Sequence, residues 1–241
     1  MARPHRFYLE SIPPVGDATL TGTEHHHLSK VLRIAPGATV FLFDGKGQEA
    51  SARVLNIAKT ESIIEVVERV HQPVSALELH LALGLTKGRQ TESVIRMCTE
   101  LGVTSIRRVL AERSIVRSKD TERITEKWQR ITIEAAKQSG RNYLPSVEDE
   151  VTLCALVQKP AGDTLRLIPH TKAARPLRDV LRGSDCRAVT ILIGPEGGFT
   201  DEEAELATQN GFISVSLGAH ILRVETACLM ALSAALYELG E

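Results

Sequence analysis

The sequence lacks long apolar runs: none of them reaches 18 residues in a chain of 241, so we expect no membrane-spanning helix. The first residues have no apolar core, and we expect no secretory signal there. The cysteines number only four, at positions 98, 154, 186 and 228, and no two have the spacing of a zinc site or a redox motif. These features favour a cytoplasmic protein with reduced thiols and no bound metal.

The familiar phosphate-binding loops are also missing. No Lys followed by Ser or Thr completes a P-loop, and Gly194, Gly197 and Gly198 do not have the Gly-x-Gly-x-x-Gly spacing of a dinucleotide loop. Glu196 lies in the same glycine-rich turn, where its carboxylate would repel a di- or triphosphate. This turn therefore favours a nucleoside-like ligand without phosphates, and S-adenosylmethionine (SAM) is the leading candidate.

Two glycine-bearing turns lie a short helix apart in the C-terminal part of the chain. The turn at 194–199 follows the apolar residues 189–193, and the turn at 217–223 follows a second short apolar stretch; both stretches are predicted strands. Thr200 and Glu203 have the spacing of a capping box, which predicts a helix that begins there and ends near Gly211. Because α/β proteins bind small ligands at the carboxyl ends of strands, the two turns are predicted to form one pocket.

The N-terminal part has the pattern of a small β-barrel. Strands are predicted at 40–43, 50–57 and 62–70, with a hairpin turn at 44–47 and a short helix before them, at 24–32. His25, His26 and His27 are consecutive and would point in different directions on that helix, so they cannot chelate one ion together. We expect them to be polar surface residues, with His26 or His27 able to contact RNA.

After a linker at 72–75, the pattern changes to alternating strands and helices. Such alternation predicts a mostly parallel sheet. The predicted strands are 77–85, 106–110 and 165–168, and the predicted helices are 91–101 and 121–139. A last helix, at 226–239, is apolar on nearly every face, which predicts burial, and a subunit interface is one surface that could bury it.

The net charge of −1 hides an uneven distribution. Residues 87–141 carry thirteen positive and seven negative charges, whereas residues 142–241 carry eight positive and fourteen negative. The middle segment is therefore a candidate surface for a polyanion such as RNA. Solvated helix faces would explain the same charges equally well.

Several stretches spread over nearly the whole chain resemble the RsmE family. They are RFYL (6–9), HHLSKVLRIAPG (26–37), LFDGKGQE (42–49), LTKGRQTESVIRMCTELGV (85–103), ERSIVR (112–117), EAAKQSGR (134–141), GPEGGF (194–199) and LGAHILRVETA (217–227). Members of this family are bacterial methyltransferases of the SPOUT superfamily, which use SAM to methylate N3 of one uridine in 16S ribosomal RNA.

The resemblance implies a fold and an assembly that periodicity alone does not give. It implies a PUA-like β-barrel, here assigned to residues 1–71 as an RNA-binding domain. A trefoil-knotted α/β methyltransferase domain would follow, at residues 72–241. It further implies a cytoplasmic homodimer whose substrate is 16S rRNA, within the assembled small ribosomal subunit.

The motifs and the resemblance together give a set of candidate site residues. For SAM they are Leu167, His170, Ile193, Gly194, Pro195, Glu196, Gly197, Gly198, Leu217, Gly218, Ile221, Leu222, Arg223, Thr226 and Ala227. For RNA they are Arg3, Arg6, His26, Arg33, Lys87, Arg89, Arg113, Arg117, Gln138 and Arg141. Arg223 and Glu225 are the catalytic candidates: the guanidinium would stabilise developing negative charge, while Glu225 would be the base or would orient Arg223 or the ligand.

Two alternatives remain open from the sequence. One is a non-catalytic RNA-binding or ribosome-assembly module with a vestigial pocket, which the intact pair of loops opposes. The other is an oxidoreductase with a nucleotide cofactor, which the loop spacing and Glu196 oppose. The modified nucleotide itself is given only by the family resemblance.

Overall fold

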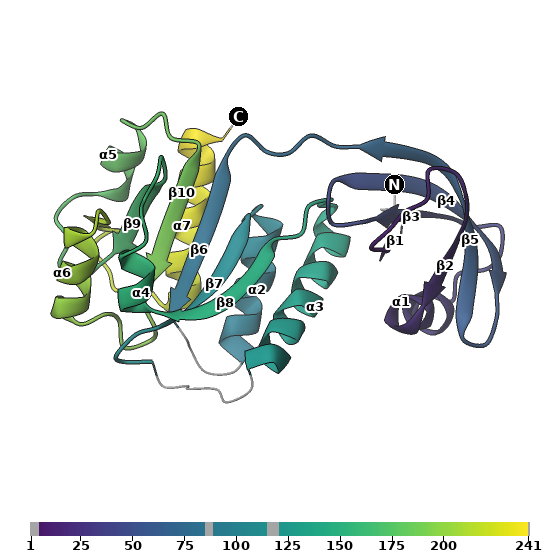
Figure 1. Cartoon of the computed structure of the whole chain (residues 1–241), viewed down its shortest axis with the longest axis horizontal. Coiled ribbons are helices and arrows are strands. Elements are labelled where there is room, and N and C mark those ends of the chain that lie inside the picture. Colours follow the sequence, from purple (N-terminus) through teal and green to yellow (C-terminus); the bar gives the residue numbers. More distant parts are fainter. Residues whose placement is uncertain (1–4, 85–88, 115–120, 241) are drawn as a thin grey trace. The chain divides into compact units, whose positions relative to one another are not determined.

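The computed structural model describes residues 5–84, 89–114 and 121–240 and separates into two compact units (Figure 1). The first unit contains residues 1–74 together with 133–144, and the second contains 75–132 together with 145–241. In the described residues, no helix has the length and apolar character needed to cross a membrane.

The first unit is built on a curled five-stranded sheet with the order β1-β3-β4-β5-β2. Its strands are β1 (Arg6–Tyr8), β2 (Gly16–Thr21), β3 (Thr39–Phe43), β4 (Gln48–Ile57) and β5 (Glu61–His71). Only β1 and β3 pair in parallel, and two irregularities between β4 and β5 increase the local twist. The three strands predicted from the sequence are confirmed, whereas the shorter β1 and β2 were not predicted.

The histidine-bearing segment covers one end of this sheet as α1 (Gly22–His26) and a π-helical turn, η1 (His27–Val31). The prediction of three surface histidines is wrong for His25, which is buried. Its Nδ1 lies 2.8 Å from Ser62 Oγ and its Nε2 lies 3.3 Å from the carbonyl oxygen of Lys59. Burial is possible because both ring nitrogens have partners.

A segment distant in sequence completes the first unit. The backbone N–H of Gly47 donates to the carbonyl of Asn142 at 3.1 Å, and the N–H of Leu144 donates to the carbonyl of Gly45 at 2.9 Å. Gly47 has φ +102° and lies so close to Tyr143 that an added Cβ would be 2.3 Å from its hydroxyl. These contacts explain why residues 133–144 group with the N-terminal strands.

The second unit contains a six-stranded sheet with the order β11-β9-β10-β6-β7-β8, in which every neighbouring pair is parallel. Its strands are β6 (Glu78–Gly84), β7 (Ser105–Leu110), β8 (Ser146–Thr152), β9 (Leu165–Pro169), β10 (Ala188–Ile193) and β11 (Ile213–Val215). The predicted parallel α/β sheet is confirmed. The highly charged β8 was not predicted, because its sequence lacks the apolar pattern of a buried strand.

Helices cover both faces of this sheet. Leu81 and Ile191 point into one core, which they share with α2 (Arg89–Glu100), α5 (Leu177–Leu181) and α7 (Val224–Leu239). Ala82 and Leu192 point into the other core, with α4 (Leu153–Val157) and α6 (Asp201–Gln209). Neighbouring residues of a strand thus face opposite layers, which explains the continuous apolar runs of the central strands.

The helices show one confirmed boundary and one apolar surface that this chain by itself leaves exposed. The predicted capping box is present at α6: Thr200 Oγ1 accepts from the N–H of Glu203 at 3.2 Å, and Glu203 accepts from the N–H of Thr200 at 3.0 Å. Helix α7 is not buried on every face, because Met230, Leu236 and Tyr237 are exposed. One face of α7 therefore carries apolar side chains that this chain does not cover.

Helix α3 spans Thr121–Ser139, the range that the sequence predicts, and packs Trp128 into the core that contains Leu81 and Ile191.

Two arginines of β7 pair with two glutamates of β8, and the two pairs differ in their exposure to solvent. Arg108 is 1% exposed, lies over the Trp128 ring at 5.3 Å, and its Nε is 3.8 Å from Glu150 Oε2. The neighbouring pair, Arg107 with Glu148, is partly open to solvent. Burial lowers the pKa of Arg108, and the nearby Glu150 carboxylate opposes that shift.

We predict that Glu150→Ala lowers the free energy of unfolding by about 3 kcal/mol, because it removes the stronger of the two carboxylate charges, Glu150 and Asp149, that compensate the buried Arg108 guanidinium. Glu148→Ala on the same strand should cost less than about 1 kcal/mol, because its ion pair is solvated. Urea denaturation of both variants measures the difference. Equal losses would contradict the assignment of Arg108 as a buried cation that depends on Glu150.

Candidate functional site

The loops that follow several parallel strands meet around one cavity of about 630 Å³ in the second unit. They come from the ends of β7, β9 and β10 and from the segment that links β11 to α7. The cavity is lined by Gln90, Arg113, Pro169, His170, Thr171, Ile193, Gly194, Pro195, Glu196, Gly197, Gly198, Phe199, Ile221, Leu222, Arg223, Val224, Glu225 and Ala227. A smaller hollow of about 140 Å³ shares the loop at 169–171 and is closed by residues 216–222.

The structure brings nearly all the predicted SAM residues to these two cavities. Leu217 and Gly218 line the smaller hollow, and all but two of the others line the larger cavity or both. Two predicted residues lie elsewhere: Leu167 is fully buried in the sheet core, and Thr226 is exposed on α7 and lines neither cavity. Leu167 is two residues before the lining residue Pro169, and Thr226 lies between the lining residues Glu225 and Ala227, so the direction of the side chains explains the difference.

Sequence reasoning missed several lining residues. Gln90, Thr171, Phe199 and Val224 all contribute to the larger cavity without having been candidates. Gln90 is near the start of α2, the helix after β6. The strand-end rule that identified the glycine turns would have found it if applied to β6 as well.

The first glycine turn lies directly against the end of β6. A Cβ added to Gly84 would be 2.5 Å from the nitrogen of Pro195 and 2.8 Å from the carbonyl carbon of Gly194. Within the turn, the N–H of Gly198 donates to the carbonyl of Pro195 at 2.8 Å, with Gly198 at φ +68°. Gly84 thus sets the position of the turn through backbone-to-backbone contact, which no residue with a side chain allows.

Arg113 crosses the same turn from the loop after β7. Its Nη1 donates to the carbonyl of Gly197 at 2.9 Å, and a Cβ at Gly197 would be 3.3 Å from the Arg113 side chain. The structure therefore puts this RNA candidate on the wall of the cavity and gives its guanidinium a hydrogen bond to the turn.

The second turn offers backbone donors. The N–H groups of residues 219–222 make no hydrogen bond to any described part of the protein. The N–H of Gly218, by contrast, donates to Ser216 Oγ at 3.2 Å. A cavity wall with several unbonded N–H groups can bind a neutral heterocyclic ligand mainly through the backbone.

Besides Arg113, three charged residues line the larger cavity: Arg223, Glu196 and Glu225. Arg223 is exposed and is the N-cap residue of α7. It forms no ion pair with either glutamate, although all three are among the described residues. The guanidinium is therefore not used to hold the loop through these carboxylates, and it is available to a substrate.

The remaining RNA candidates are distributed over both units. Arg6 and Gln138 line a cavity of the first unit, and burial lowers the pKa of Arg141, in the same unit, to about 10. His26 and Arg33 are exposed, and Arg89 is the first residue of α2. Arg3, Lys87 and Arg117 lie outside the described residues. The structure thus does not bring these candidates to one place.

Comparison with known proteins places this chain in a class of proteins. Residues 73–236 match the family of RNA methyltransferase domains, and residues 20–67 match the RNA methyltransferase PUA domain. The protein is thus a two-part RNA methyltransferase by fold and sequence.

Curated relatives narrow this class to one family. The ribosomal RNA small subunit methyltransferase E of Synechocystis sp. is 40% identical over 219 residues, covering 89% of this chain and 71% of the relative. That of Bacillus subtilis is 31% identical over 232 residues, covering 91% and 90%. The chain belongs to the ribosomal RNA small subunit methyltransferase E family, the RsmE family.

Solved structures agree over the full length. The Neisseria gonorrhoeae ribosomal RNA small subunit methyltransferase E, bound to S-adenosyl methionine, matches with a TM-score of 0.89 and 33% identity, covering 98% of each chain. A Legionella pneumophila protein in complex with the bound cofactor SAM matches with a TM-score of 0.92 and 32% identity, also covering 98% of each chain.

We predict that Gly84→Ala lowers the free energy of unfolding by about 1–3 kcal/mol, because the new methyl group overlaps the backbone of the first glycine turn. Gly183→Ala is the matched control: no atom lies within 4 Å of its added Cβ, and its φ is not in the left-handed region. That substitution should change stability by no more than about 0.5 kcal/mol. Urea denaturation that ranks the two variants equally would show that the close approach at Gly84 is not a constraint.

Proposed function

We propose that this protein is a SAM-dependent methyltransferase that methylates N3 of a specific uridine in the 16S rRNA of the small ribosomal subunit. The observation that carries the proposal is the convergence of both glycine turns on one cavity at the carboxyl ends of parallel strands. Membership of the RsmE family supports it, as does the bound SAM of the Neisseria relative. A non-catalytic module would have no need for the two intact turns.

The residues around the cavity fit SAM in their chemistry. The free N–H groups of residues 219–222 would hold its neutral heterocycle, and the carboxylate of Glu196 suits hydroxyl groups or a cation. That same carboxylate disfavours a cofactor with several phosphates. When bound, SAM supplies an electrophilic methyl group. In this proposal the chain itself orients the acceptor base, excludes water and removes the proton from N3.

Arg223 has the chemistry that the acceptor requires. Methylation at N3 of uridine uses the nitrogen lone pair, so the N3 proton has to leave and negative charge spreads onto the neighbouring carbonyl oxygens. A guanidinium offers fixed donors to that charge and remains protonated at every relevant pH. For the same reason Arg223 cannot be the base. Its exposure at the cavity and its lack of an ion pair with Glu196 or Glu225 support this role.

Glu225 is the second proposed catalytic residue, because it lines the same cavity two residues after Arg223. Its carboxylate would accept the N3 proton, directly or through water, or would face the sulfonium end of the ligand. Glu225→Gln removes the charge but keeps the shape of the side chain. A lower methylation rate with unchanged SAM affinity would therefore show that Glu225 accepts the N3 proton.

The proposal extends to the arrangement of the chain and its substrate. Residues 1–71 would act as the PUA-like RNA-binding domain and residues 72–241 as a trefoil-knotted methyltransferase domain. The exposed side chains of His26 and Arg33 would contact RNA phosphates, as would Arg113 at the cavity wall. We propose a cytoplasmic enzyme whose substrate is the rRNA of the assembled small subunit.

We predict that the purified protein binds SAM and transfers its methyl group to N3 of one uridine of small-subunit RNA. Arg223→Ala should keep SAM affinity within a few-fold but slow single-turnover methylation by roughly 10²–10³, the usual effect of losing one donor to a developing oxyanion. Calorimetry with SAM and mass mapping of RNA from small subunits that lack the modification measure these quantities.

Arg187→Ala is the control, because Arg187 is exposed and directly precedes the amino end of β10, away from the strand ends that form the cavity. It should bind SAM and methylate RNA as the wild type does. Loss of SAM binding in Arg223→Ala would make that residue structural, and a normal methylation rate would remove it from the mechanism. A wild-type protein that binds no SAM would refute the proposed function itself.

We further propose that two copies associate through the apolar face of α7, formed by Met230, Leu236 and Tyr237, which are 45%, 39% and 85% exposed. Apolar side chains gathered on one face of a helix are typical of an interface. Leu236→Glu should convert the dimer into a monomer in light scattering at micromolar concentration. Val31→Glu, an exposed valine of the first unit, should leave the mass unchanged. A wild-type monomer that methylates RNA at the full rate would rule out the dimer.

A further inference from the structure

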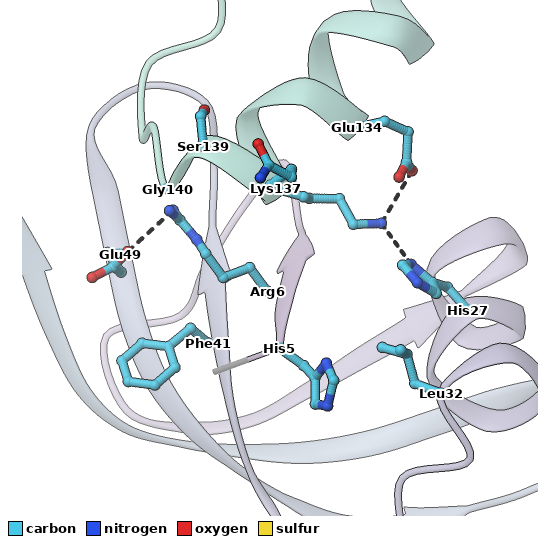
Figure 2. Close-up of a pocket in the computed structure, with 11 residues that line it drawn as sticks. His5, Arg6, His27, Leu32, Phe41, Glu49, Glu134, Lys137, Ser139 and Gly140 are labelled. Carbon is cyan, nitrogen blue, oxygen red and sulfur yellow. Dashed lines mark hydrogen bonds and ion pairs between the residues drawn. The ribbon is translucent and has the colours of Figure 1, made fainter. Parts of the chain in front are cut away.

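The first unit contains its own cavity, of about 560 Å³, between the strands β1 and β3 and the last turn of α3 (Figure 2). Every lining residue belongs to that unit. The cavity is lined by His5, Arg6, His27, Leu32, Phe41, Glu49, Glu134, Lys137, Gln138, Ser139 and Gly140. No step of the proposed methyl transfer uses it.

The two cations of this cavity are neutralised by carboxylates. Arg6 Nη2 lies 3.1 Å from Glu49 Oε2, and the Arg6 side chain is 9% exposed. Lys137 Nζ lies 3.0 Å from Glu24 Oε1 and 3.1 Å from Glu134 Oε1, and its side chain is 6% exposed. A phosphate would have to displace these carboxylates from their cations. The cavity therefore favours a neutral ligand over an anion.

Lys137 also fixes the protonation of His27. Its Nζ lies 2.9 Å from His27 Nδ1, and because an ammonium group can only donate, Nδ1 is the acceptor (Figure 2). The imidazole is then neutral and carries its proton on Nε2. Burial lowers the pKa of His27, and the charge of Lys137 lowers it further. Among the described residues nothing accepts the Nε2–H, so this donor is available to a ligand.

The rest of the lining combines flat apolar surface with one unused hydroxyl. Figure 2 shows Ser139 and Gly140 at the end of α3 on one side, with Phe41 and His5 on the opposite side. Phe41 is half-buried and His5 is exposed. The hydroxyl of Ser139 is buried, and within the described part of the chain it has no hydrogen-bond partner. A flat heterocycle with polar groups on its edge matches such a lining, because aromatic rings stack on it and the edge needs donors.

We propose that this cavity binds one unstacked base of single-stranded RNA, a recognition site separate from the SAM cavity. The proposal rests on the proposed function, since it assumes an RNA substrate. The base would stack on Phe41, while His27 Nε2–H bonds its edge. The adjoining phosphates would remain outside the cavity. Arg33 would contact one of these phosphates. It follows the lining residue Leu32, has φ +52°, is exposed and forms no ion pair with any described residue.

The test measures affinity for short oligouridylate and oligoadenylate with the full-length protein. Phe41→Ala should weaken binding about tenfold, the usual effect of losing one stacked base. Phe41→Leu keeps the apolar volume but lacks a ring, and it should weaken binding as well. Ser139→Leu adds apolar bulk to the cavity wall and should weaken binding by a similar factor. Thr39→Leu, at an exposed position of β3 that does not line the cavity, is the matched control and should bind as the wild type does.

An abasic nucleotide provides the second arm of the test. If one base occupies the cavity, an abasic substitution at that base should weaken binding to the wild type by the same factor as Phe41→Ala, and the two losses should not add.

Normal oligonucleotide binding by both Phe41→Leu and Ser139→Leu, with unchanged SAM affinity and methylation, would overturn the cavity assignment and leave the proposed function intact. Competition by inorganic phosphate that shifts the His27 ring signals in NMR would identify an anion site and overturn it too. Failure of the wild type to bind SAM would instead refute the proposed function.

Discussion

The parallel pairing of all six strands of the second unit is the constraint on which the site depends. Parallel strands end at the same edge of a sheet, so loops separated by many residues in the sequence have to meet there. The two glycine turns and the loop at 169–171 come together for this reason. Gly84 sets the remaining distance, because its missing side chain lets the first turn pack directly on the end of β6.

The first unit is held together differently, by buried polar contacts between distant segments. Lys137 near the end of α3 contacts Glu24 and His27 of the N-terminal helical segment, and Arg6 pairs with Glu49. Such contacts are costly to break, because each would leave a buried group without a partner. They also balance the charges of a cavity on which His27 leaves one donor without a partner among the described residues, and such a lining suits a neutral base.

Arg113 lies on the wall of the cavity of the second unit and is also a candidate RNA-binding residue. Its hydrogen bond to the carbonyl of Gly197 gives it a structural task in the first glycine turn. In the proposed function the same side chain contacts RNA, so binding of the substrate would affect the geometry of the first glycine turn. A basic residue that the charge pattern assigned to a surface thus has a second role, which only its tertiary contacts reveal.

The sequence by itself determined the elements that local patterns specify. The capping box at Thr200, the helix over residues 121–139 and the parallel sheet follow from residue spacing, and both glycine turns were identified with most of their lining residues. Short or charged elements such as β1, β2 and β8 have no such pattern and were missed. Only the tertiary structure decided that His25 is buried, that α7 keeps one apolar face exposed and that residues 133–144 complete the N-terminal unit. These features depend on contacts between residues far apart in the chain, and neither periodicity nor spacing encodes such contacts.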